Sequence, residues 1–202
     1  MVWASLHTAR AIGGTLDLSA DPRMAWFTTS DGMLCPELCL LGITPRSLNR
    51  DALLKTLRAH PLTRNFAVRL SGGQTYELIT LEGAPFTLIA QTLRASGSVE
   101  LISVEYHDAS RMPQVGAMVA QYGAPTKAVD QGYPLLLSVG GFYDSAQLSF
   151  VSQPKNAFTP DSFAHLMRMH SPSEYAIVAD SIANVHPWRG FAYRMPHPRR
   201  LN

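Results

Sequence analysis

Residues 66–82 read Phe-Ala-Val-Arg-Leu-Ser-Gly-Gly-Gln-Thr-Tyr-Glu-Leu-Ile-Thr-Leu-Glu, and this stretch decides the fold class. Residues 66–70 are a short apolar-rich run, and residues 75–82 alternate as a half-buried strand does. Gly72 and Gly73 lie between the two runs and supply a turn. We therefore predict an antiparallel β-hairpin here, and a domain that contains several hairpins.

Part of the same stretch, Leu-Ser-Gly-Gly-Gln at residues 70–74, matches the signature sequence of ATP-binding-cassette ATPases. In that family the motif opens a helix whose N-terminus faces nucleotide phosphate. Here strand-like residues follow the motif, and the chain contains no Gly-x-x-x-x-Gly-Lys-Ser/Thr loop. We interpret the five residues as a hairpin turn and expect no nucleotide site.

Apolar periodicity and capping signals predict five helices along the chain. The predicted helices occupy residues 48–59, 85–96 and about 113–122, a segment that starts at 159–160, and a segment from 171 to about 186. Further short strands are predicted at residues 11–18, 24–29, 99–106, 133–139 and 146–152, with Gly140-Gly141 as a turn. The predicted fold is α+β, with antiparallel β-hairpins packed against about five helices.

The order helix, proline, strand, glycine pair, strand occurs twice, at about residues 44–82 and 110–152. The repeat predicts two tandem helix-strand-strand modules. The alternative is that two unrelated segments share an order of elements that is common in α+β proteins. We expect one compact domain over residues 1–185, followed by a basic, aromatic C-terminal arm over residues 186–202.

Residues 98–139 place a strand, a helix ending in Tyr122-Gly123-Ala124-Pro125, and another strand in succession. This order resembles the modules of β-lactamase-inhibitor-protein-like domains and of small outer-membrane assembly lipoproteins. The resemblance implies a non-catalytic binding role. The chain departs from the lipoprotein pattern because it shows no lipoprotein signal.

Composition excludes several classes of protein. Charged residues make up 16% of the 202 residues and the formal net charge is +2, so a disordered tail protein, a collagen-like chain and a classical basic nucleic-acid-binding domain are excluded. No apolar run approaches the ~18 residues that span a bilayer. The N-terminus contains Arg10 and Asp17 and lacks the apolar core of a signal peptide. We expect a soluble, cytoplasmic protein; the alternative is a periplasmic one whose leader was removed.

Cys35 and Cys39 are the two cysteines of the chain. Two are too few for a disulfide framework or a four-thiolate zinc site. A bridge between them would close a very short loop and would need a specific turn geometry. We predict two half-buried thiols, with a disulfide or a redox-active pair as the alternatives.

Two pairs of residues are weak candidates for an acid–base or metal site. His107 and Asp108 follow a predicted strand, where functional loops are common. His165 and His170 are five residues apart, whereas helical metal ligands are three or four apart, so we expect His170 to pack on Tyr175 instead. No nucleophile elbow or cofactor motif accompanies them, and we expect no metal and no cofactor.

The C-terminal arm is the most unusual segment. It interleaves four arginines with aromatic residues and contains no acidic residue; the candidate partner-binding residues are Trp188, Arg189, Phe191, Tyr193, Arg194, Arg199 and Arg200. Removing these four arginines from the 17 basic residues leaves 13 against 15 acidic ones, so the body is mildly acidic. Such an arm can bind a protein or RNA, or it can fold back on its own domain.

These observations favour a non-enzymatic interaction protein, an accessory subunit of a larger assembly that uses the arm as a contact element. One alternative is a small hydrolase or transferase with a His/Asp site. The other is an accessory protein that binds RNA through the tail.

Overall fold

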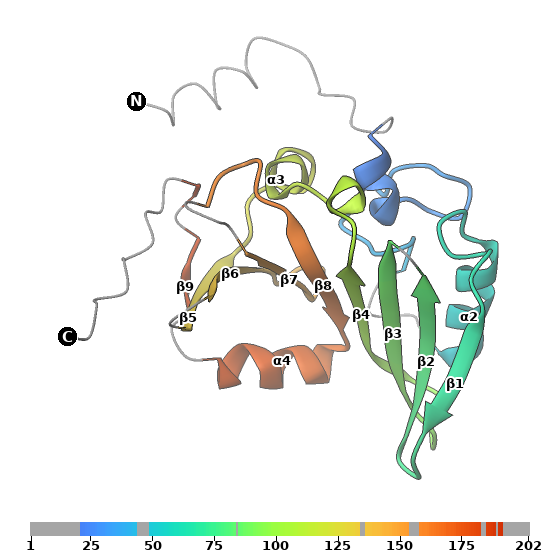
Figure 1. Cartoon of the computed structure of the whole chain (residues 1–202). Helices are drawn as coiled ribbons and strands as arrows, with labels where there is room; N and C mark the ends of the chain where they lie inside the picture. The colour runs from blue at the N-terminus through green and yellow to red at the C-terminus, as the bar shows by residue number, and fades with distance from the viewer. Residues whose placement is uncertain are drawn as a thin grey trace.

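The computed structural model describes residues 21–43, 49–83, 85–133, 136–153, 158–182, 185–188 and 190–191 (Figure 1). Its strands are β1 (Val68–Gly72), β2 (Tyr76–Gly83), β3 (Phe86–Leu93), β4 (Val99–Tyr106), β5 (Lys127–Tyr133), β6 (Leu136–Tyr143), β7 (Leu148–Ser152), β8 (Ala164–His170) and β9 (Val185–Pro187). The helices are η2 (Pro22–Phe27), α2 (Arg50–Ala59), η3 (Ala109–Arg111), α3 (Val115–Tyr122) and α4 (Pro172–Ser181), where η marks a 3-10 helix.

The strands form one sheet in the order β1-β2-β3-β4-β8-β7-β6-β5-β9, and every neighbouring pair is antiparallel. The prediction of antiparallel pairing is confirmed, but the prediction of about five helices packed on hairpins is wrong. In the part of the chain described, a nine-stranded sheet is accompanied by three α-helices and two short 3-10 helices. No helix among these residues is long and apolar enough to cross a membrane.

The hairpin at residues 66–82 is present as β1 and β2. Gly72 has φ 132°, and a Cβ there would lie 2.5 Å from the carbonyl oxygen of Tyr76, so this turn position requires glycine. The Leu-Ser-Gly-Gly-Gln sequence therefore occupies the end of β1 and the turn, as predicted, and does not open a helix.

The segment predicted as a helix over residues 85–96 is strand β3, which lies inside the sheet between β2 and β4. Its apolar residues satisfy the helical spacing, but they satisfy an alternating pattern as well. Phe86, Leu88 and Ala90 are buried on one face, and Ile89 points to the other. Pairing with β2 and β4 on both sides stabilises the strand, so tertiary contacts override the local helical pattern.

The start signal at Thr159-Pro160 belongs to a turn and not to a helix. The Ser162 amide donates to the Thr159 carbonyl at 2.9 Å, and the Thr159 amide donates to Ser162 Oγ at 2.9 Å. Residues that cap helices also close turns, because the same short polar side chains bond to nearby backbone amides. The chain then enters β8, which pairs with β4 and β7.

The turn before β8 also caps α3. The amides of Val115 and Gly116, at the start of that helix, donate to the carbonyls of Ser162 and Pro160 at 2.9 and 2.8 Å. A Cβ on Gly116 would lie 2.7 Å from the Pro160 carbonyl oxygen, so glycine permits this close approach. The helix ends at Gly123, which has φ 86°.

Three further predictions need correction. Residues 24–29 are not a strand: Asp21 accepts from the Arg23 amide and Pro22 starts η2. The last helix ends at Ser181, and β9 follows it. Gly140-Gly141 is not a turn, since both glycines lie inside β6. The strand predicted over residues 11–18 lies outside the described residues.

Each half of the sheet is built by a helix followed by four strands, α2 with β1–β4 and α3 with β5–β8. The halves join where β4 pairs with β8. The glycine pairs of the two halves are not equivalent, because Gly72 ends β1 whereas Gly140 lies within β6. Duplication of residues 44–82 and 110–152 stays a prediction.

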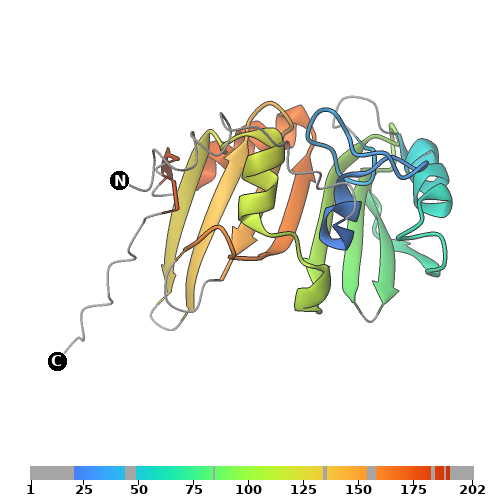
Figure 2. The same cartoon turned by 90° about the horizontal axis from the view of Figure 1, so that it is seen from above.

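The main core lies on one face of the sheet, under α2, α3 and η2 (Figure 2). This covered face holds the fully buried side chains of the strands, among them Leu81, Leu88, Val104, Met167 and Phe150. Leu53, Leu54 and Leu57 form the apolar side of α2, and Asn49 caps this helix by accepting from the Ala52 amide at 2.8 Å.

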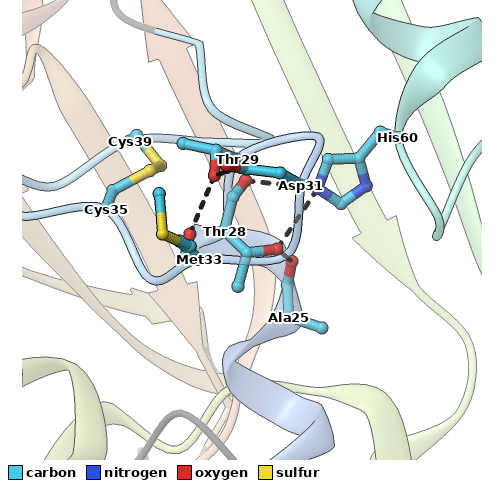
Figure 3. Close-up of a disulfide and its surroundings, with 8 residues drawn as sticks. All are labelled: Ala25, Thr28, Thr29, Asp31, Met33, Cys35, Cys39 and His60. Atoms are coloured by element: carbon cyan, nitrogen blue, oxygen red, sulfur yellow. Dashed lines mark hydrogen bonds between the residues drawn. A yellow bond between two sulfur atoms is a disulfide. The ribbon is translucent and has the colours of Figure 1, made fainter.

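Cys35 and Cys39 form a disulfide with their Cα atoms 6.2 Å apart, so the prediction of two thiols is wrong (Figure 3). Backbone bonds from the Cys35 amide to the Phe27 carbonyl and from the Leu41 amide to the Trp26 carbonyl hold the segment against η2 and bring the cysteines together. They are 4% and 2% exposed. Closing so short a loop contributes about 2 kcal/mol by chain entropy.

His60, at the end of α2, hydrogen-bonds to Thr28 in the segment of residues 21–43 (Figure 3). Its Nδ1 accepts from the Leu62 amide at 3.2 Å, and its Nε2 lies 3.2 Å from the Thr28 carbonyl oxygen and 3.3 Å from Thr28 Oγ1. One neutral tautomer satisfies all three contacts. Burial lowers the pKa of His60, in keeping with a neutral ring.

Candidate interaction surface

The second face of the sheet is covered unevenly. Over β5 and β6 it packs against α4, where Val129, Phe142 and Tyr175 form a small separate core. Figures 1 and 2 show that α4 lies beneath the β5–β8 half and that β1–β4 have no helix on that side. Helix α2 belongs to the opposite, covered face. Among the described elements, nothing packs over this side of β1–β4.

We call this surface the open face. By the strand registers it consists of Arg69, Ser71, Tyr76, Leu78, Thr80, Glu82, Thr87, Ile89, Gln91, Leu93, Leu101, Ser103 and Glu105, and it is bordered by Leu166 and Arg168 on the neighbouring strand β8. These side chains form rows across the strands, because the residues of one register line point the same way.

Two exposed apolar side chains, Ile89 and Tyr76, lie on the open face among polar neighbours. Ile89 is 39% exposed, between Thr80 on β2 and Ser103 on β4. Tyr76 is 41% exposed, opposite the half-buried Leu93. Exposed apolar side chains on the solvent face of a sheet can contribute to a protein-binding site.

The rim of the open face carries both signs of charge. Arg69 Nη1 and Glu82 Oε2 are 3.6 Å apart at the β1 side. At the β8 side, the exposed Glu105 and Arg168 lie on neighbouring strands. The charges of the two carboxylates and the two guanidinium groups therefore cancel. The face has no excess positive charge with which to attract a polyanion.

The start of α4 is fixed at the edge of the open face by Glu100. The Glu100 carboxylate accepts from Ser171 Oγ at 2.6 Å and from Ser98 Oγ at 3.1 Å. Ser171 caps α4, because its Oγ accepts from the Glu174 amide at 3.3 Å. The helix start predicted at residue 171 is thus confirmed, and the contact with β4 joins the two halves of the sheet.

His170 is a buried member of the interface between α4 and the sheet. Its Nε2 lies 3.2 Å from Ser149 Oγ, and its ring contacts Tyr175 with the centroids 5.9 Å apart, as predicted. Tyr175 in turn donates to Asp144 at 2.7 Å, and Asp144 pairs with Lys127 at 3.4 Å. Burial, with the charge of Arg168, lowers the pKa of His170 to about 4.

The Ser149–His170 contact resembles the serine–histidine part of a catalytic triad, but its surroundings favour a structural role. Ser149 is 8% exposed and His170 is 3% exposed, so a substrate has no access to the pair. Within the part of the chain described, no carboxylate hydrogen-bonds to the imidazole Nδ1. The pair serves instead to anchor α4.

The other candidate residues are not brought together. His165 and His170 are five positions apart along the strand β8, a separation of roughly 16 Å at ~3.3 Å per residue. Burial lowers the pKa of His165, opposed in part by the charge of Glu105. The described residues contain no group of three His, Cys, Asp or Glu side chains that could hold a metal ion.

His107 and Asp108 form the turn after β4, at the surface. His107 Nε2 lies 2.8 Å from Thr87 Oγ1. Asp108 caps η3, since its side chain accepts from the Ser110 amide at 2.8 Å. That bond lowers the pKa of Asp108 and occupies its carboxylate.

Two aromatic residues of the C-terminal arm fold back on the domain. Trp188 and Phe191 both contact Phe158, with ring centroids 5.6 and 5.5 Å apart, and they pack against the main core. Residues 185–187 form β9 at the edge of the sheet. The remaining candidates, Arg189, Tyr193, Arg194, Arg199 and Arg200, lie outside the described residues.

No family model matches the chain, and no curated protein matches it. Among solved structures, a cysteine-rich secretory protein from Staphylococcus aureus subsp. aureus Mu50 is similar, with a TM-score of 0.35 and 10% identity. The similarity covers 79% of this chain and 57% of that protein, so the chain spans less than two thirds of its length. A likeness of this strength carries no argument about function.

The helix predicted over residues 85–96 hides the open face, because that face exists only when β3 is a strand. A signal was present in residues 86–93, where Thr87, Ile89, Gln91 and Leu93 alternate with the core residues. A strand that alternates apolar and mixed side chains has one buried and one solvated face. This alternation places Ile89 on the solvated face.

Proposed function

We propose that this chain is a non-enzymatic protein-interaction subunit that binds a protein partner on the open face of its sheet. The observation that carries the proposal is Ile89, an exposed aliphatic side chain at the centre of a rigid, uncovered four-stranded surface. A preformed sheet loses little conformational entropy on binding, so even a modest apolar contact adds to affinity.

The chemistry of the face defines the partner. A complementary surface has an apolar centre that covers Ile89 and Tyr76, and a rim with carboxylates near Arg168 and cations near Glu105. The balance of charge argues for a protein rather than a nucleic acid on this face. The arm beyond Phe191 is proposed as a second contact element, since four aromatic or basic positions in it lie beyond the aromatic cluster on Phe158.

The test compares Ile89→Lys with Ile177→Lys by affinity purification from the native source, followed by titration of the captured protein with purified chains. Ile177 is 64% exposed on α4, away from the open face, so it is a matched control. We expect Ile89→Lys to weaken binding at least tenfold, because it buries a charge in the interface, and Ile177→Lys to bind as the wild type does.

Equal affinities of the two variants would refute the open face as the binding site. A partner that is lost steeply with salt and released by nuclease would point to RNA and not to the proposed protein. Both substitutions lie on exposed positions, so the thermal midpoints of the variants should match that of the wild type.

We also propose that the chain matures in an oxidising compartment, in keeping with the periplasmic alternative. The support is the buried Cys35–Cys39 disulfide, since such bonds are rare where glutathione keeps thiols reduced. Alkylation of the denatured natural protein without reductant should leave both cysteines unmodified; modification of both would contradict the proposal.

A further inference from the structure

We infer that two copies of this chain pair through the free edge of β1 to form one continuous antiparallel sheet. This inference does not rest on the proposed function, because it concerns the edge of the sheet and not its open face. In the strand order, β1 is terminal and has a neighbour only in β2 among the described strands. Alternate residues of such a strand direct N–H and C=O groups away from the sheet, where they can bond to an added strand.

The edge is exposed over almost its whole length. Four of the five residues of β1, from Arg69 to Gly72, are exposed, and Leu70 is 46% exposed. Leu70 projects on the covered face beside the fully buried Ile79, so the apolar core reaches solvent at this point. A strand added at this edge would remove Leu70 from water and complete the backbone bonding of β1 at the same time.

The opposite edge of the sheet is protected. There β9 is three residues long and ends in Pro187, which donates no backbone hydrogen bond. The chain then turns in to place Trp188 on Phe158. Proline and short strands are the usual devices that prevent edge pairing, and β1 contains neither proline nor lysine.

The sequence of β1 is complementary to itself. An antiparallel pair centred on a two-fold axis at Leu70 would place Leu70 opposite its own copy and Arg69 opposite Ser71 of the copy. The apolar side chains then share one face, and no like charges are directly opposed. This self-complementarity favours a second copy over an unrelated extended peptide.

The test begins with the mass of the wild-type chain by sedimentation over a wide concentration range. We expect a reversible dimer, and we expect Leu70→Lys to be monomeric because two ammonium groups would meet at the axis. Ile89→Lys, on the open face, should dimerise as the wild type does, so failure of the pairing and failure of the proposed function are distinguishable. A wild type that is monomeric throughout, or a Leu70→Lys variant that still dimerises, would overturn the inference.

A cross-linking measurement checks the register even if Leu70→Lys folds poorly. Directly opposed residues of antiparallel strands have Cα atoms about 4.5–5.5 Å apart, within the range of a disulfide. The Leu70→Cys chain should therefore form a covalent dimer under mild oxidation, and Ile89→Cys at the same concentration should not. Equal cross-linking of the two variants would show random collision and would contradict the proposed pairing.

Discussion

His170 shows how a single buried side chain can make the stability of this protein depend on pH. Its ring is 3% exposed, between Ser149 and Tyr175, and burial lowers its pKa from 6.5 to about 4. The unfolded chain therefore takes up a proton near pH 6.5, whereas the folded chain does not until about pH 4. The stabilisation is complete above pH 6.5 and is lost as the pH falls between these two values.

Between pH 6.5 and pH 4 we expect the free energy of unfolding of the wild type to fall by about 3 kcal/mol more than that of a His170→Asn variant. One pKa unit corresponds to about 1.4 kcal/mol. Asparagine retains a hydrogen-bonding group for Ser149 but does not titrate there. Urea unfolding at several pH values measures the difference. Parallel stability curves for the two chains would show that His170 does not titrate as its burial implies.

At the scale of the elements, the packing of β6 against β7 depends on Gly141. A Cβ at this position would lie 2.3 Å from Cε1 of Phe150, whose side chain is 1% exposed and enclosed by the core. Because the ring cannot move aside cheaply, we expect Gly141→Ala to lower the free energy of unfolding by about 1–3 kcal/mol.

Gly73 provides the matched control for that substitution. It lies in the turn between β1 and β2, and a Cβ there would meet nothing within 4 Å. Urea denaturation should leave Gly73→Ala within about 0.5 kcal/mol of the wild type. Equal stability of the Gly141 variant would mean that Phe150 can adopt another rotamer without loss.

The elements also show what can be predicted from sequence. The helix predicted over residues 48–59 is identified by its leucine stripe, and the helix predicted from residue 171 by its capping sequence. Both signals act locally and need no partner. Segment 86–93 carries two periods at once, and the choice between them is made by β2 and β4, which local reasoning does not contain. The open face was missed for the same reason, because it exists only once four strands are in register.

For the molecule as a whole, the aromatic contact at the chain end links the sheet edge to the main core. Trp188, Phe191 and Phe158 contact one another with centroids 5.5–5.6 Å apart. We expect deletion of residues 187–202 to destabilise the domain by about 3 kcal/mol, because it removes two large apolar side chains from this cluster.

Deletion of residues 192–202 alone leaves the cluster intact and serves as the control. Thermal and urea unfolding of the two truncated chains should differ, and the shorter deletion should retain the stability of the full chain. If both deletions unfold alike, the packing of Trp188 and Phe191 does not contribute to stability.

The burial of the Cys35–Cys39 bond implies that the disulfide forms before residues 21–43 pack against the domain. Thiol–disulfide exchange requires a thiolate to reach a sulfur atom in line, and the packed segment of residues 21–43 shields both sulfurs. Oxidation must therefore happen while that segment is still loose on the nascent domain. Once the segment is packed, a reductant can break the bond only as fast as the segment opens locally. The disulfide therefore persists after the chain has left the compartment in which it formed.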